Sequence, residues 1–157
     1  MAGGGWNMKF MADVMLGKLA RWLRVLGYDT WYRRFSAPED IHPLQLEGRY
    51  LLSRHEEATK TYEKSVWIHS DHVQFQLAEL KNRIGFCPER SAWFSRCLVC
   101  NTLLKPAPPD VACDHVPEYV FFTCMSEIRF CSSCGRFYWP GTHRTRMVRQ
   151  LEAWGFN

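Results

Sequence analysis

The sequence predicts an α/β protein in which a parallel sheet flanked by helices is followed by a small zinc ribbon. Two observations predict this fold class. Up to about residue 84, short apolar segments alternate with helical patterns, and such alternation gives right-handed crossovers between parallel strands. Two Cys-x-x-Cys pairs then follow a change in composition near residue 85. We expect a sheet domain over residues 8–90 and a zinc ribbon with a C-terminal helix over residues 91–157, after a disordered extension at residues 1–7.

Four short segments are predicted as the strands of the sheet. Each is rich in leucine, aromatic or β-branched side chains and is bounded by polar residues or glycine. They are residues 9–12, 29–32, 49–53 and 65–70. The carboxyl ends of parallel strands share one edge, and in open α/β sheets that edge carries the functional site.

The segments between the strands are predicted as helices. Over residues 14–27, apolar side chains recur at steps of three and four, and Gly27 supplies the stop. Further helices are expected after the turn at residues 36–40, over residues 55–62 and over residues 71–84.

The C-terminal part is predicted from prolines, an aromatic run and a last helical pattern. Three prolines, at residues 106, 108 and 109, argue against regular structure there. The aromatic run at residues 118–123 predicts a ribbon strand, and residues 142–154 predict a closing helix.

The two Cys-x-x-Cys pairs predict one tetrahedral structural zinc site, because each pair presents two thiolates from one tight turn. They are Cys97/Cys100 and Cys131/Cys134. Disulfides are the alternative. The odd total of seven cysteines and the lack of an export signal favour zinc. The remaining cysteines are interpreted as ordinary thiols: Cys87, Cys113 and Cys124.

Composition and charge limit the kinds of partner that this chain can have. With 46% hydrophobic and 23% charged residues, the chain is typical of a globular protein, and its net charge of +4 permits phosphate binding without requiring it. No apolar run approaches the ~20 residues that span a bilayer. The first residues lack the features of a signal peptide. We expect an intracellular protein, cytoplasmic or nuclear and not secreted, with no membrane partner.

Several acidic side chains follow the predicted strands and are expected to meet at the carboxyl edge. Asp13 follows the first strand, Asp71 the fourth, and Glu39 with Asp40 precedes the second helix, while His55 follows the third strand. Such a cluster suits a magnesium or manganese ion. Capping of the next helix is the competing explanation for each aspartate alone, above all for Asp71.

Two runs of sequence are specific enough to indicate a family. One is Asp-x-Met-Leu-Gly-x-Leu-Ala-Arg-Trp-Leu-Arg at residues 13–24, and the other is Gly-Arg-x-Tyr-Trp-Pro-Gly-Thr-His at residues 135–143. With Glu47-Gly48-Arg49 between them, they closely resemble the Mut-seven C-terminal RNase domain family. The resemblance covers about residues 8–147. It implies a PIN-like sheet, a C-terminal zinc ribbon and metal-dependent cleavage of RNA.

The resemblance also implies site residues. Asp13, Asp40 and Asp71 would be the catalytic carboxylates that hold magnesium or manganese, with Glu39 as the alternative to Asp40. One position departs from the family, which usually shows Thr-Arg-Asp where this chain has Ser53-Arg54-His55. Magnesium binds imidazole poorly and manganese accepts it better, so activity is expected to be reduced, metal-shifted or lost. A carboxylate could still come from the residues that follow, Glu56 and Glu57.

RNA contacts are expected from basic and aromatic side chains. Arg54 is predicted to contact a phosphate oxygen or to lie solvated, and Tyr138 to stack on a base. Phe137 and Trp139 are expected in the ribbon's own core. Phosphate contacts, or else a solvated helix face, are predicted for a basic run: Arg136, Arg144, Arg146 and Arg149. His143 is expected to pack against its neighbours or to contact phosphate.

Three functions remain at this point. The first is a ribonuclease that hydrolyses phosphodiester bonds. The second is an RNA-binding module whose catalysis His55 has impaired, and the third is a zinc-ribbon adaptor that binds other proteins.

Overall fold

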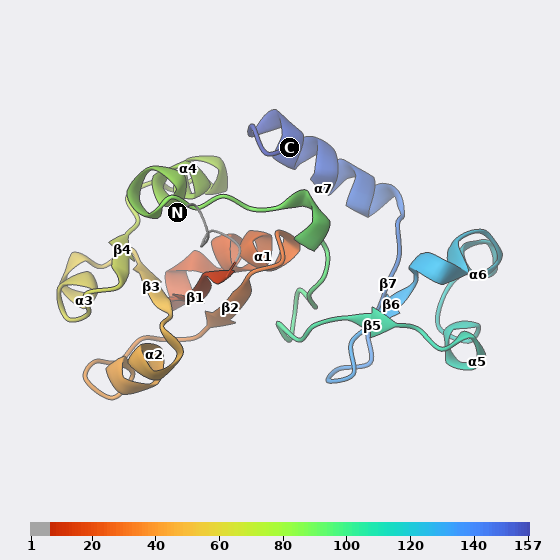
Figure 1. Ribbon diagram of the computed structural model, residues 1–157, viewed down its shortest axis with the longest axis horizontal. Helices are drawn as coiled ribbons and strands as arrows, with labels where there is room; N and C mark the ends of the chain where they lie inside the picture. Colours follow the sequence, from red (N-terminus) through yellow and green to blue (C-terminus); the bar gives the residue numbers. More distant parts are fainter. Residues whose placement is uncertain (1–6) are drawn as a thin grey trace. The chain divides into compact units, whose positions relative to one another are not determined.

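A computed structural model describes residues 7–157 of the chain (Figure 1). The chain divides into two compact units between Phe94 and Ser95. The extension predicted at residues 1–7 lies outside the described residues except for Asn7. Within the described part of the chain, no helix is long and apolar enough to cross a bilayer.

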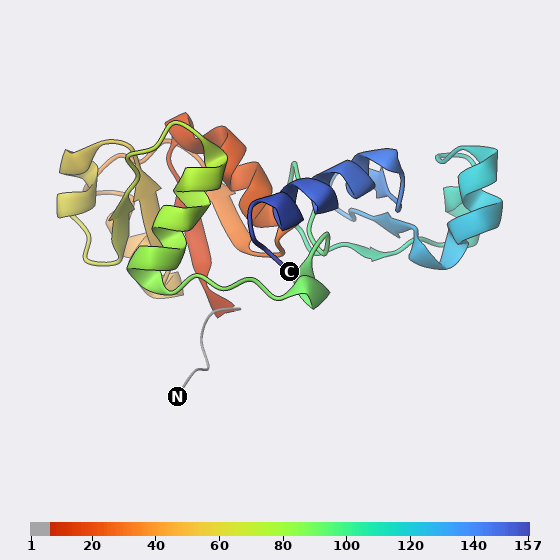
Figure 2. The same cartoon turned by 90° about the horizontal axis from the view of Figure 1, so that it is seen from above.

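The first unit contains a four-stranded parallel sheet, as predicted (Figures 1 and 2). The strands lie in the order β2-β1-β3-β4, so the first strand in sequence is central. They are β1 (Lys9–Ala12), β2 (Asp29–Tyr32), β3 (Tyr50–Ser53) and β4 (Ser65–Trp67). Phe10, Met11 and Ala12 are all buried, which is typical of a central strand covered on both faces.

In the part of this unit that the structure describes, three of the four helices bury apolar side chains, whereas the five-residue helix Glu56–Lys60 buries none. Leu44 of α2 packs with Met11 and Leu51, neighbours in the β1–β3 register. Phe10, which points to the other face, contacts the rings of Tyr28 and Phe86. The helices are α1 (Gly17–Val25), α2 (Ile41–Glu47), α3 (Glu56–Lys60) and α4 (Val73–Ile84), with 3-10 turns η2 (Val14–Leu16) and η3 (Arg90–Ala92).

The second unit has a small antiparallel sheet in the order β5-β6-β7. Its buried core consists of Ala107, Ala112, Val116, Val120 and Ile128, against which Phe137 and Trp139 pack as predicted. The strands are β5 (Lys105–Pro106), β6 (Arg129–Phe130) and β7 (Phe137–Tyr138). The helices are α5 (Pro109–Ala112), α6 (Glu118–Cys124), the 3-10 turn η4 (Met125–Glu127) and α7 (Thr142–Ala153).

Two predictions for this unit are wrong. Residues 118–123 form helix α6, because Val120, Phe121 and Cys124 pack against one core at helical spacing. The prolines do not exclude regular structure: Pro106 lies in edge strand β5, and Pro109 starts α5, where its missing N–H costs nothing.

Candidate functional site

The four cysteines form one group, as their spacing predicted. The thiol sulfurs of Cys97, Cys100, Cys131 and Cys134 all lie within 4.8 Å of one another. Cys97 Sγ and Cys134 Sγ are 3.7 Å apart. A tetrahedral zinc ion with Zn–S bonds of about 2.3 Å requires sulfur separations of about 3.8 Å. The donor set and its spacing therefore fit a closed structural zinc site.

The two knuckles share one backbone design. The N–H of Cys97 donates to Thr102 O at 2.8 Å, and the N–H of Cys131 donates to Arg136 O at 2.9 Å. The residue after the second cysteine is left-handed in both turns, with φ of 67° at Asn101 and 76° at Gly135. Asparagine and glycine tolerate that conformation best. Asn101 and Gly135 are therefore a second sequence signal for the two knuckles, in addition to the cysteine spacing.

The backbone around the second knuckle favours a thiolate. Burial opposes ionisation of Cys131, but N–H groups of Cys134 and Ser133 donate to its sulfur and lower its pKa to about 6. An ionised thiol is the form that binds zinc.

Tyr138 contacts the first knuckle. Its hydroxyl accepts the N–H of Leu98 at 3.2 Å and lies 3.1 Å from Cys97 Sγ. Burial, together with the neighbouring Cys97 sulfur, raises the pKa of Tyr138. The side chain predicted to stack on RNA thus supports the cysteine site.

Asp13 is fixed at the carboxyl end of β1. Its side chain is 5% exposed. One carboxylate oxygen accepts the N–H groups of Val14 at 2.8 Å and Phe35 at 3.1 Å, and the other accepts the hydroxyl of Ser53 at 3.2 Å. The capping role is therefore real, since Val14 begins η2. The same carboxylate also joins the ends of β1 and β3 to the loop after β2.

Arg54 and Asp71 form an ion pair at the same edge. The Arg54 guanidinium also donates to Ser70 O at 3.0 Å and His69 O at 3.3 Å. Arg54 therefore holds the turn that presents Asp71 and is not a solvated strand-end residue. The Asp71 side chain is 80% exposed, and the strand it follows lies about 10 Å from β1 because β3 is between them.

Asp40 accepts the N–H of Ser36 and lies 3.7 Å from the guanidinium of Arg33. Glu39 is exposed. Asp40 is thus the more strongly bonded of the two, at the start of α2, and its choice over Glu39 as the site acid stays a prediction.

His55 is exposed and occupies the cap position of α3, where its N–H donates to the Ser53 hydroxyl at 3.1 Å. Glu56 and Glu57 pair with Lys60 at 3.4 and 2.8 Å. In this structure both glutamates therefore bond within their own helix, and a carboxylate from either in place of residue 55 stays a prediction.

The aspartates do not converge as the cysteines do. In residues 7–157, the four cysteines are the one set of three or more metal-ligating side chains whose donor atoms gather in this way. Oxygen donors suit magnesium or manganese. Asp40 and Asp71, however, pair with Arg33 and Arg54, so both would have to change partner to share an ion with Asp13.

Part of the Glu47-Gly48-Arg49 motif lies at the opposite edge of the sheet. Arg49 is buried, donates to the Asp29 carboxylate at 2.8 Å, and lies 3.8 Å from the centre of the Trp31 ring. A buried arginine paired in this way secures the amino ends of the strands.

Glu79 was missed by the sequence reasoning. Its carboxylate accepts the N–H groups of His69 at 3.0 Å and Ser70 at 2.8 Å, and lies 3.2 Å from His69 Nδ1. These bonds end β4 at Trp67 instead of Ser70, because they take the N–H groups that would continue the ladder. Glu79 therefore shapes the turn before Asp71.

Glu79→Gln is expected to destabilise the protein by about 1–2 kcal/mol at pH 7, because charge-assisted hydrogen bonds are lost. Burial opposes the Glu79 charge, but the donors at His69 and Ser70 outweigh it and lower its pKa below the usual value. A lowered pKa stabilises the fold above the unfolded pKa, and the contribution disappears as pH falls through the folded pKa. Urea unfolding of wild type and Glu79→Gln at pH 7 and pH 3.5 measures the difference in their unfolding free energy. The same difference at both pH values would contradict the prediction.

The predicted RNA contacts of the second unit lie near its knuckles and in α7. Arg136 and His143 are exposed, and Arg144 is partly buried. Their contact with RNA stays a prediction.

Comparison with known families supports the resemblance. The family model described as Mut7-C RNAse domain matches residues 8–151, nearly the whole chain. Comparisons with curated proteins and with solved structures found no match. The family indicates a ribonuclease-like function with RNA as substrate or ligand, and the four-cysteine group agrees with a bound metal. This chain therefore belongs to the Mut7-C RNAse domain family.

Proposed function

We propose that this protein is a metal-dependent ribonuclease whose site is the carboxyl edge of the parallel sheet. The observation that carries the proposal is Asp13, a buried carboxylate tied to three parts of that edge in a chain of an RNase family. Parallel α/β sheets place their chemistry at this edge.

In this proposal Asp13, Asp40 and Asp71 bind one divalent cation. When bound, magnesium or manganese supplies a water of lowered pKa and shields charge on the phosphate. Asp13 is preorganised by its three hydrogen bonds, while Asp40 and Asp71 leave their arginines. Release of Asp71 frees Arg54 to contact a phosphate oxygen, which is the role predicted for it.

The cysteine site takes no part in the chemistry. A closed set of four thiolates leaves no open position for substrate, and such zinc sites are structural. Its role is to hold residues 95–157 in the fold that presents basic side chains to RNA.

Cleavage of labelled RNA by the zinc-loaded full chain tests the proposal, with magnesium and manganese titrated separately. Metal-dependent product supports it. A strong chelator is avoided, because it would remove zinc as well as the catalytic ion. Tight RNA binding without product at any metal concentration would contradict it.

That second outcome is the expectation of the rival function, an RNA-binding module with impaired catalysis. Two observations favour the rival: His55 stands where the family has a carboxylate, and the aspartates do not gather as a metal group within residues 7–157. Both functions predict binding that weakens with salt.

His55→Asp is expected to raise magnesium-dependent cleavage several-fold, because it returns an oxygen ligand that magnesium accepts. His55 is exposed and caps a short helix, and aspartate is a better cap, so folding is not at risk. Initial rates with each metal measure the effect. His72→Asp, a matched change at the cap of α4, is the control. Equal rates for His55→Asp and wild type would exclude residue 55 from the site.

A further inference from the structure

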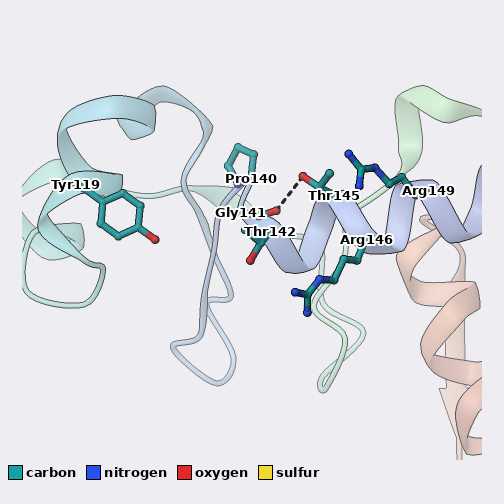
Figure 3. A pocket seen from close by; sticks show the side chains of 7 residues that line it. All are labelled: Tyr119, Pro140, Gly141, Thr142, Thr145, Arg146 and Arg149. Carbon is teal, nitrogen blue, oxygen red and sulfur yellow. Dashed lines mark hydrogen bonds between the residues drawn. The ribbon is translucent and has the colours of Figure 1, made fainter.

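A pocket in the second unit, lined by no cysteine, lies between α6 and the start of α7 (Figure 3). Its volume is about 510 Å³, within the range of roughly 300–1,000 Å³ that holds small ligands. It is lined by Tyr119, Pro140, Gly141, Thr142, Thr145, Arg146 and Arg149. Two arginines, two threonines, a tyrosine and a proline therefore share one cavity.

One face of α7 supplies the polar wall. Thr142, Thr145, Arg146 and Arg149 recur at helical spacing, whereas the buried residues of this helix are Met147 and Leu151. Thr145 is held in place, because its hydroxyl donates to Gly141 O at 3.2 Å, the dashed line in Figure 3.

The two pocket arginines are Arg146 and Arg149. Neither guanidinium makes a hydrogen bond or ion pair with any residue from 7 to 157. Arg96 and Arg129 of the same unit, by contrast, donate to Asn101 O and Ser126 O. Between Glu127 and Glu152 the sequence contains five arginines and no acidic residue. The cavity therefore offers positive charge with no internal partner.

The aromatic wall comes from α6. Tyr119 is 70% exposed, and Phe122, three residues on, is 76% exposed. Figure 3 shows Tyr119 reaching toward Gly141 and Thr142 from one side, while Arg146 reaches toward Thr142 from the other. Proteins that bind single-stranded nucleic acid combine exposed aromatic rings, on which bases stack, with cationic side chains that contact the phosphates. This pocket has both.

We propose that this pocket binds single-stranded RNA, with one unpaired base stacked on Tyr119 and the adjoining phosphates on Arg146 and Arg149. A duplex is excluded from this mode, because its bases are already stacked and cannot lie against the ring. The inference rests on the proposed function for its choice of RNA, and it names the strandedness that this function leaves open.

Binding is measured with the zinc-loaded full chain and a labelled single-stranded oligouridine of about 12 nucleotides, without added magnesium or manganese. Tyr119→Ala is expected to weaken binding about tenfold, and Tyr119→Phe to keep it within about twofold, since the ring remains. Phe75→Ala, an exposed aromatic of α4, is the matched control and binds like wild type. A duplex of equal length is expected to bind all four proteins alike.

Arg146→Gln/Arg149→Gln is expected to weaken binding and to reduce the slope of log affinity against log salt by about 1.4, two phosphates of a single strand. Lys18→Gln/Arg21→Gln removes the same charge from the exposed side of α1 and is the control. It is expected to leave the slope unchanged. Equal slopes for the two double variants would overturn the phosphate contacts.

These measurements separate the pocket from the nuclease. If the Tyr119→Ala and arginine variants lose binding to single strands and no protein forms product with either metal, the pocket proposal is supported and the catalytic proposal is removed. Metal-dependent cleavage by wild type supports the catalytic proposal. If the pocket variants then bind and cleave single strands like wild type, the pocket proposal is removed. Unchanged zinc content in each variant shows that the fold is intact.

Discussion

Cys131→Ser is expected to unfold residues 95–157 while the sheet of residues 7–94 stays folded. Apart from its cysteines, the second unit buries only the five side chains of its core cluster and Met147 and Leu151 of α7. Its strands have two residues each, and this is too little apolar surface to stand alone. Zinc binding to four thiolates contributes about 10 kcal/mol or more to the folding of such a module. Serine removes one ligand and leaves the other three without a closed site.

Zinc content per chain and hydrogen exchange of the two units measure this result. The expected outcome is loss of zinc with fast exchange confined to residues 95–157. Cys124→Ser is the matched control, because Cys124 lies outside the four-cysteine group and its thiol bonds only Val120 O. It is expected to keep its zinc. A Cys131→Ser protein that keeps both zinc and slow exchange would contradict the structural role of the site.

Asp13→Asn is expected to reduce RNA cleavage about a hundredfold or more without unfolding the protein. The amide is isosteric with the carboxylate. Its oxygen can still accept the N–H groups of Val14 and Phe35, and its NH₂ can donate to the Ser53 hydroxyl, which also accepts. The charge that would hold a divalent cation is what is lost.

Initial rates at saturating magnesium or manganese, together with urea unfolding of the same preparations, separate chemistry from folding. Asp114→Asn removes one exposed carboxylate from the second unit and is expected to cleave like wild type. An Asp13→Asn protein that is stably folded and fully active would remove the sheet edge from consideration as the active site.

The sequence predicted the parallel sheet because strand-length apolar runs alternate with helical periodicity, and this pattern is local. It also predicted the cysteine site, since two ligands within one turn are recognisable from spacing alone. The prediction for residues 118–123 was wrong for the same reason. An aromatic, β-branched run favours a strand locally, but packing of Val120, Phe121 and Cys124 against one core, at helical spacing, selects a helix.

At the carboxyl edge, the sequence identified the acids but not their partners. Asp13 contacts Phe35 and Ser53, which lie 22 and 40 residues away, and Arg54 reaches Asp71 across 17. Glu79 gave no sequence signal, because a glutamate on an exposed helix pattern is ordinary until a turn of the chain places N–H groups against it.

The sequence by itself determined the strands of the parallel sheet, most of the helices, the four thiol ligands and the family. The tertiary structure decided which carboxylate is buried, which arginines are committed and which are free, and that Tyr119 faces α7 across a cavity. Periodicity and ligand spacing are properties of neighbouring residues, whereas hydrogen-bond partners and cavities arise only when distant segments pack together.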